Sequence, residues 1–174
     1  MGRIAILITV ALLWPFHPAQ AEKRVWRTYE GDPSSKVSVC YPSDLLAPYR
    51  NRKRHKIDLA SPGGSTEATA ILFGRPDKRG DRGTTVPDEL EWALNQEKST
   101  RARILHKEVT PESYFYISTG DGSLDYGWGV HVDHSVKQLF VSFPVARAAQ
   151  WKGVPERMRA CFRSLGPVTD PLAY

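Results

Sequence analysis

The sequence predicts an exported α+β protein in which an antiparallel β-sheet of about five to seven strands is flanked by helices. Three observations carry this prediction. The first 21 residues have the layout of a cleaved signal peptide, four strand-like segments in the second half are joined by short turns, and two segments have the apolar spacing of helices. Strands with such short links pair antiparallel, because a parallel return needs a dozen or more residues.

The N-terminal segment combines a positive start with an apolar run. Arg3 precedes residues 4–14, which are apolar except for Thr9, and Ala19-Gln20-Ala21 has the small-x-small pattern of a signal peptidase site. A membrane-spanning helix needs about 20 apolar residues, so this run is too short to span. We therefore expect cleavage between Ala21 and Glu22 and a mature protein in the periplasm or outside the cell.

The mature chain has the size of one ordinary domain. Cleavage after residue 21 leaves 153 residues, and the loss of Arg3 lowers the net charge from +5 to +4. We expect a single domain over residues 22–166 and a flexible tail over 167–174. The two cysteines, Cys40 and Cys161, are expected to pair, because an exported chain with an even, small number of cysteines usually oxidises them.

The strands before the first helix are short. Period-two patterns and turn residues predict them at residues 25–29, 37–41, 57–60 and 68–73, separated by loops at Gly31-Asp32-Pro33 and at residues 61–65.

A helix should follow the loop at residues 74–83. Thr84 and Thr85 precede a proline and two acidic residues, which is a typical helix start. Its inward stripe has i, i+4, i+7, i+8 spacing, and the helix should end near Ser99. The stripe consists of Val86, Leu90, Ala93 and Leu94.

The strongest β signal lies in the second half of the chain. Strands are predicted at residues 104–109, 114–118, 126–132 and 138–143, with turns at 120–122 and 133–135. After one or two helical turns at 146–151, a final amphipathic helix should run to Gly166-Pro167. Its buried stripe consists of Val154, Met158, Cys161, Phe162 and Leu165. A bond from Cys161 to Cys40 requires this helix to cover the Cys40 face of the second strand.

The segment Val37-x-Val39-x-Tyr41-Pro42-x-Asp44-Leu45-Leu46, together with the order of elements after it, resembles a group of small exported bacterial proteins without assigned activity. Their fold is similar to the PsbP-type α/β/α sandwich. The resemblance covers most of residues 26–165 and implies an antiparallel sheet with helices packed on it. It matches scaffold positions alone, so it implies no catalytic residues.

A basic run between the second and third predicted strands is the sharpest binding candidate. It contains Arg50, Arg52, Lys53, Arg54 and Lys56. Adjacent cations in one loop add their fields, which favours an anionic envelope surface or an acidic protein as partner. The alternative is a solvated loop with no partner. Nucleic acid is excluded by the expected location and because no aromatic side chains alternate with these charges.

Three residues at the end of a predicted strand have metal-ligand side chains: His131, Asp133 and His134. His131 and Asp133 point to one face of the strand and His134 is in the turn after it, so the spacing predicts no third or fourth ligand converging with them. Zinc needs three or four, and a polar strand end is therefore the preferred interpretation. Residues 120–125 lack the full spacing of a calcium loop, and no Gly-x-Ser-x-Gly elbow is present. Trp26, Trp92, Trp128 and Trp151 are interpreted as packing residues.

These observations predict a non-enzymatic binding or accessory protein without a cofactor. Two alternatives stay open. One is an envelope-interaction module that uses the basic run, and the other is an enzyme that uses His131 or His134 with Asp125 or Asp133.

Overall fold

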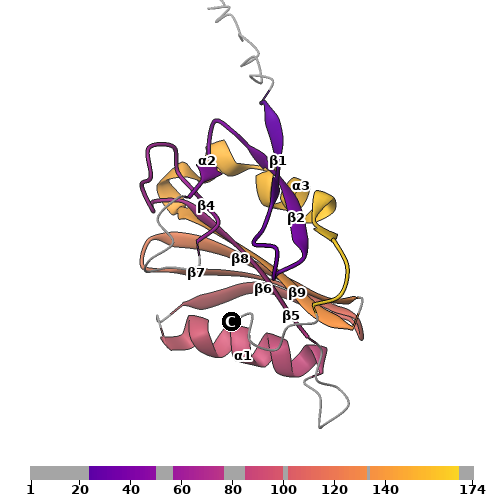
Figure 1. Cartoon of the computed structure of the whole chain (residues 1–174). Helices are drawn as coiled ribbons and strands as arrows, with labels where there is room; N and C mark the ends of the chain where they lie inside the picture. The colour runs from indigo at the N-terminus through magenta and orange to yellow at the C-terminus, as the bar shows by residue number, and fades with distance from the viewer. Residues whose placement is uncertain (1–23, 50–56, 77–84, 100–101, 133, 169–174) are drawn as a thin grey trace, which may run out of the picture.

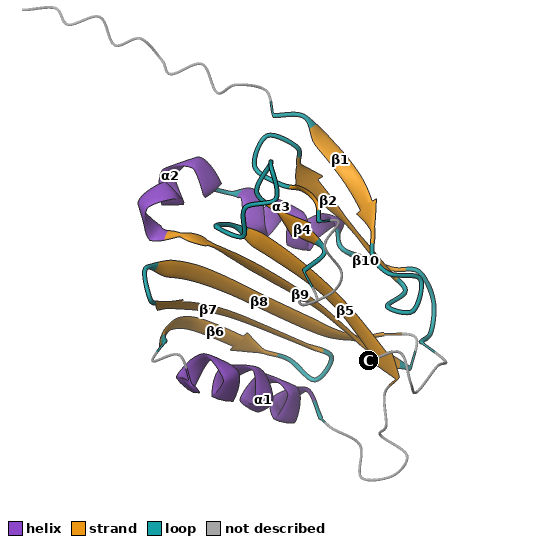
Figure 2. Ribbon diagram, turned by 60° about the vertical axis from the view of Figure 1, so that its left-hand side comes forward, coloured by secondary structure: helices purple, strands orange, loops and turns teal. Residues whose placement is uncertain are grey.

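The computed structural model describes residues 24–49, 57–76, 85–99, 102–132 and 134–168, and its strands form two antiparallel sheets. The larger sheet has seven strands in the order β3-β4-β5-β9-β8-β7-β6, and the smaller has the order β1-β2-β10. Helix α1 covers one face of the larger sheet, and α2, α3 and the small sheet lie on the other face (Figures 1 and 2). We call these the α1 face and the α3 face. The predicted fold class is confirmed.

The described chain contains ten strands, three α-helices and one short 3-10 helix. The strands are β1 (Trp26–Glu30), β2 (Val37–Pro42), β3 (Ala47–Pro48), β4 (Leu59–Ala60), β5 (Thr69–Pro76), β6 (Arg103–Val109), β7 (Ser113–Gly120), β8 (Ser123–Val132), β9 (Ser135–Pro144) and β10 (Arg163–Ser164). The helices are α1 (Val86–Ser99), the 3-10 turn η2 (Val145–Arg147), α2 (Ala148–Trp151) and α3 (Val154–Cys161).

A β-meander of β6, β7, β8 and β9 forms one side of the larger sheet, up to its β6 edge, as the turn residues predict. Asp121 and Gly122 both have positive φ, 48° and 80°, which is the backbone of a tight hairpin turn between β7 and β8. Residues 120–125 therefore contain a two-residue hairpin turn at Asp121 and Gly122, followed by the start of β8. Strand β5 pairs with β9 along its whole length, from Thr69 opposite Ser142 to Pro76 opposite Ser135.

Two glycines in β8 let tyrosine rings lie against the strand. Gly127 is opposite Tyr116 and Gly129 is opposite Tyr114 in the β7–β8 pairing. A Cβ at Gly127 would lie 2.1 Å from the Tyr116 ring, and one at Gly129 would lie 2.3 Å from the Tyr114 ring. A close neighbour thus explains glycine at both positions.

Helix α1 begins and packs as the sequence predicts. The Thr85 N–H and hydroxyl both donate to the Asp88 carboxylate, at 2.7 and 2.8 Å. Val86, Leu90 and Ala93 are buried and form a second core cluster with Tyr114 and Tyr116 on the sheet. The α1 stripe therefore covers the α1 face above β7 and β8.

A buried polar network joins α1 to the sheet. Glu89, which is 1% exposed, forms an ion pair with Arg75 of β5. The Gln138 amide donates to the Tyr114 hydroxyl at 2.8 Å and to Glu89 at 3.4 Å. Burial raises the pKa of Tyr114, although the Gln138 hydrogen bond and the Arg75 charge act in the opposite direction. The network fixes α1 in register on the sheet.

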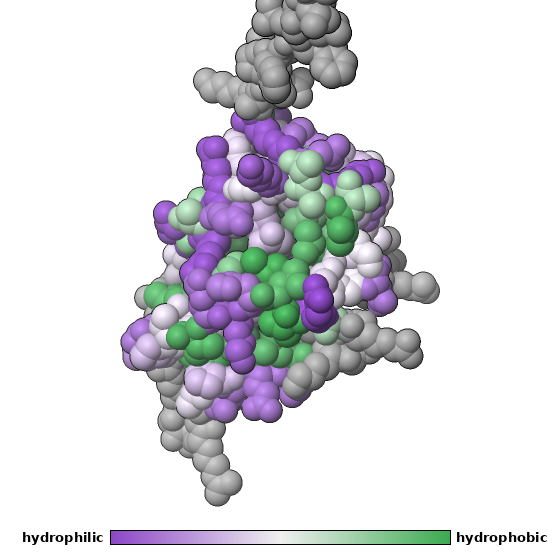
Figure 3. Space-filling model, turned by 180° about the vertical axis from the view of Figure 1, so that it is seen from behind, coloured by the Kyte–Doolittle hydropathy of each residue, from purple (hydrophilic) through white to green (hydrophobic). Residues whose placement is uncertain are grey.

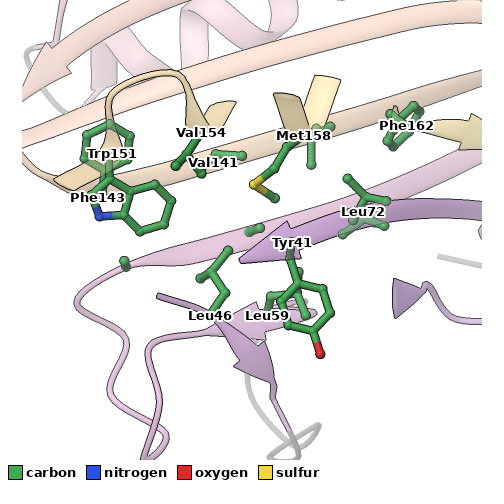
Figure 4. Packing of buried hydrophobic residues seen from close by; sticks show 14 of the residues in the cluster. Tyr41, Leu46, Leu59, Leu72, Val141, Phe143, Trp151, Val154, Met158 and Phe162 are labelled. Atoms are coloured by element: carbon green, nitrogen blue, oxygen red, sulfur yellow. The ribbon is translucent and has the colours of Figure 1, made fainter. Parts of the chain in front are cut away.

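The main core lies between the α3 face and the elements that cover it. The Phe143 and Trp151 rings are stacked with centroids 4.5 Å apart, and Met158 of α3 is fully buried among aliphatic side chains (Figure 4). Trp26 and Trp128 are partly buried against this core. The packing role expected for these three tryptophans is thus correct, whereas the Trp92 side chain lies outside the described part.

The disulfide between Cys40 and Cys161 is present, with Cα atoms 5.8 Å apart. It ties the C-terminal end of α3 to β2, with Cys161 beside Cys40 along the edge of the strand that β10 continues. The helix is shorter than expected, however. It ends at Cys161, Phe162 has extended backbone, and Arg163 and Ser164 pair with β2 as β10. Leu165, which was assigned to the buried stripe, is 49% exposed. Pairing with the free edge of β2 replaces the last helical turn.

The described chain stays packed to residue 168. Lys137 of β9 is fully buried, and its ammonium group donates to the carbonyls of Ser35 and Gly166 at 3.1 and 3.0 Å. The Val168 N–H donates to the Ser135 hydroxyl at 2.8 Å, and Val168 is 4% exposed. The ordered packing thus passes the expected boundary at 166 by two residues, and the tail over 169–174 lies outside the described residues.

Candidate functional site

A groove opens on the α3 face, between α3 and the strands β6 and β7 at the edge of the larger sheet. Its volume is about 430 Å³, and it is lined by His106, Phe115, Ile117, Glu156, Arg159 and Ala160. Figure 3 views the molecule from the side of β6 and shows a green, hydrophobic area in the middle of this surface, bordered by purple, hydrophilic residues. The groove has the size of many small-molecule sites, which range over about 300–1,000 Å³.

The sheet side of the groove follows from strand alternation and one bulge. Phe115 and Ile117 are on the α3 face of β7, because Tyr114 and Tyr116 beside them point to α1. The pairing of β6 with β7 shifts between Ile104 and His106, which brings His106 opposite Ile117. The His106 ring is 2.9 Å from the Glu108 carboxylate and 6.0 Å, between centroids, from Phe115.

The helix side presents Glu156, Arg159 and Ala160 from the exposed face of α3. The Arg159 guanidinium lies 4.6 Å from the centre of the Phe115 ring and 6.0 Å from that of Trp128. Such a cation–π contact contributes about 0.5–1 kcal/mol at exposed sites. Burial, and then the nearby Glu156 carboxylate, raise the pKa of Tyr126, which places that carboxylate near the same ring cluster.

A narrow crevice of about 10 Å³ adjoins the groove. Phe115 and Arg159 line both spaces, and the inner one is completed by apolar residues of β8, β9 and α3. These are Tyr126, Gly127, Trp128, Leu139, Val141 and Pro155. Trp128 also packs edge-on against Phe162, with centroids 4.8 Å apart. The groove thus has an apolar, aromatic floor, and the Arg159 guanidinium lies over that floor from the helix side.

A second, smaller pocket lies at the other end of the α3 face. It has a volume of about 240 Å³ and is bridged by an ion pair of 2.9 Å between Arg147 and Glu67. Its lining also includes Asp44, Ser61, Ser65 and Trp151. Trp151 is 2% exposed and stacked on Phe143, so its ring face is not available to a ligand.

The structure does not support the His131 and Asp125 pairing of the enzyme alternative. Both residues are in β8, six positions apart, so they lie about 20 Å from each other along the strand. The Asp125 carboxylate accepts a hydrogen bond of 2.8 Å from Ser123. His134 is exposed in the β8–β9 turn with φ of 53°, and Asp133 lies outside the described residues. Within the described ranges, no three His, Cys, Asp or Glu side chains are placed to hold a metal.

The other predicted site residues are not placed. The basic run with Arg50, Arg52, Lys53, Arg54 and Lys56 and the cleavage site at Ala21 and Glu22 lie outside the described residues, so both stay predictions. Sequence reasoning missed the groove, because its walls come from residues about fifty positions apart. The sequence places Arg159 off the apolar stripe of its helix, which predicts an exposed side chain. The structure shows it half-buried instead.

No family model and no curated protein matches the chain, but several solved structures share its fold, and two of them follow. Cyanobacterial PsbP (CyanoP) from Synechocystis superimposes with a TM-score of 0.55 at 11% identity, over 83% of this chain and 95% of that one. The Ran-binding protein Mog1p of Saccharomyces cerevisiae gives 0.53 at 6% identity, over 82% and 97%. The chain therefore has a PsbP-like α+β fold, as the sequence resemblance implied. Among the described helices, none has the length and apolarity needed to cross a membrane.

Proposed function

We propose that this protein is an exported, non-enzymatic binding or accessory protein and that the groove between α3 and the β6–β7 edge is its binding site. The observation that carries the proposal is the groove itself. It exposes Phe115, Ile117 and Ala160 together in a concave surface of ligand size. Apolar surface gathered in a concavity favours binding, because covering it removes it from water.

The lining favours binding over catalysis. It contains no Ser, Thr, Cys or Lys that could act as a nucleophile. Its one imidazole, His106, is on the opposite wall from Arg159, and no hydroxyl or thiol lines the groove for that imidazole to activate. The polar groups of the groove thus suit recognition of a bound group better than proton transfer to one.

The fold gives separate support. Mog1p, which has the same fold over most of both chains, is a Ran-binding protein. A PsbP-like sandwich can therefore serve as a protein-binding scaffold, and we infer a similar non-catalytic role here. Export is inferred from the signal-like segment before Glu22 and is consistent with the Cys40–Cys161 disulfide.

The test uses the neutral apolar dye Nile red with the mature protein. We expect the dye to bind with increased fluorescence and Ile117→Arg to abolish most of this increase, because Ile117 is in the groove floor. Val145→Arg is the matched control, since Val145 is an exposed apolar residue that does not line the groove. Circular dichroism and the Tm confirm that both variants fold. Equal loss in the two variants, or no loss in Ile117→Arg, would refute the groove as the binding site.

A further inference from the structure

We propose that the groove takes an amphipathic anion, namely an apolar chain or ring that carries a carboxylate, and that Arg159 is the residue that binds the carboxylate. This inference rests on the proposed function and adds the chemical class of the ligand. It is carried by the position of one guanidinium group relative to the apolar floor of the groove.

Arg159 is held in place but keeps its hydrogen-bonding capacity. Its guanidinium lies over the Phe115 ring at 4.6 Å, and stacking of this kind uses the face of the group and leaves its N–H edge free. In the described part of the chain, no ion pair includes Arg159. A guanidinium fixed beside apolar surface binds a carboxylate with two parallel hydrogen bonds, and both are charge-assisted.

The apolar part of the ligand has its own surface. Phe115 and Ile117 form the floor, and Ala160 contributes a methyl group from the turn of α3 next to Arg159. The crevice beyond this floor, with a volume of about 10 Å³, is too small to take a chain or ring, so the apolar part would lie along the floor itself. The carboxylate would then meet the N–H edge of Arg159, whose guanidinium lies over Phe115.

A cation is the main competing class, because Glu156 also lines the groove and aromatic rings bind cations. The ring faces of Phe115 and Trp128, however, are already approached by Arg159. A cationic ligand must displace the Arg159 side chain from the rings, whereas an anionic ligand can bind the guanidinium in its present position. Glu156 repels the anion, so removing its charge should strengthen binding.

Three probes with the same ten-carbon chain test the class: decanoate, decanol and decyltrimethylammonium. Each is titrated into the mature protein below its critical micelle concentration, with binding followed by tryptophan fluorescence and by calorimetry. We expect decanoate to bind most tightly. Arg159→Gln should lower the affinity for decanoate roughly tenfold or more. The affinity for decanol should stay unchanged, since only the charged hydrogen bonds are lost. Glu156→Gln should increase the affinity for decanoate, because it removes a negative charge from the groove.

Arg157→Gln is the matched control. Arg157 is on the same helix and lies over the Trp26 ring at 4.2 Å, but it does not line the groove. It should leave decanoate binding as in the wild type. A peptide that ends in phenylalanine, tested as the free acid and as the amide, then identifies the source of the carboxylate. Preference for the acid indicates a chain terminus, and binding of decanoate alone indicates a lipid-like acid.

The outcomes separate the two proposals. If decanol binds as well as decanoate, or if the cation binds best, the carboxylate class is wrong and the groove remains a binding site. If none of the three probes binds, the groove proposal and the ligand class both fail. An equal effect of Arg157→Gln and Arg159→Gln would also overturn the assignment of Arg159.

Discussion

The contact between Gly127 and Tyr116 gives the sharpest prediction about the fold. A methyl group at Gly127 would lie 2.1 Å from Cε1, 2.3 Å from Cζ and 2.7 Å from the hydroxyl oxygen of Tyr116. Ordinary carbon contacts are about 3.5–4.0 Å, so the ring would have to move by more than 1 Å. Tyr116 is 1% exposed beneath α1, which leaves no free space for that movement.

We therefore expect Gly127→Ala to lower the free energy of unfolding by about 1–3 kcal/mol, the usual cost of overpacking a core, with the upper end favoured. Equilibrium unfolding in urea, followed by far-UV circular dichroism, measures this as a lower midpoint at an unchanged m-value. A double-mutant cycle isolates the cause, because Tyr116→Leu removes the ring that the methyl group would meet.

In the Tyr116→Leu background, Gly127→Ala should cost less than about 0.5 kcal/mol, since a β-strand tolerates alanine where space exists. The reasoning is refuted if Gly127→Ala costs the same in both backgrounds. A cost below about 0.5 kcal/mol in the wild-type background would equally show that the ring can move aside.

Three further predictions concern stability. Replacing Cys40 and Cys161 with serine opens a loop of 121 residues, which should cost about 5 kcal/mol in the chain-entropy account; a loss below about 1 kcal/mol in urea unfolding would contradict it. Hydrogen bonds from Thr85 hold the pKa of Asp88 below its ordinary value of 3.8, so the stabilisation by this carboxylate is present above that pH and is lost as the pH falls through the lowered pKa. Asp88→Asn should flatten the acid limb of a Tm–pH curve, and an unchanged limb would exclude this contribution. Glu89→Leu leaves the partly buried Arg75 unpaired and should cost about 3 kcal/mol in the same urea assay, with most of it regained when Arg75 is also made leucine; no recovery would point to lost packing instead.

Local signals in the sequence were sufficient for the elements that depend on neighbouring residues. The Thr85 and Asp88 hydrogen bonds start α1 as the hydroxyl and acid spacing predicted. The turn at Asp121 and Gly122 set the β7–β8 hairpin, because only a few residue types adopt its backbone. The PsbP-like resemblance then supplied the order of elements, which propensities alone do not determine.

The end of α3 shows where local reasoning fails. Leu165 continues the helical spacing of Val154 and Met158, but the chain leaves the helix at Cys161 and pairs with β2. That pairing partner lies more than a hundred residues earlier, so no local pattern reveals it. The groove escaped prediction for a similar reason, since His106 and Arg159 meet only after the sheet and α3 are packed.

The small sheet also has a consequence for the order of folding. Its middle strand, β2, receives β10 and the Cys161 sulfur from near the end of the chain. Cys40 therefore leaves the ribosome 121 residues before its partner, which at roughly 5–20 residues per second amounts to a delay on the order of 10 s. Neither the disulfide nor the β2–β10 pairing can form before the last part of the domain has been made. Both therefore join the two ends of the domain.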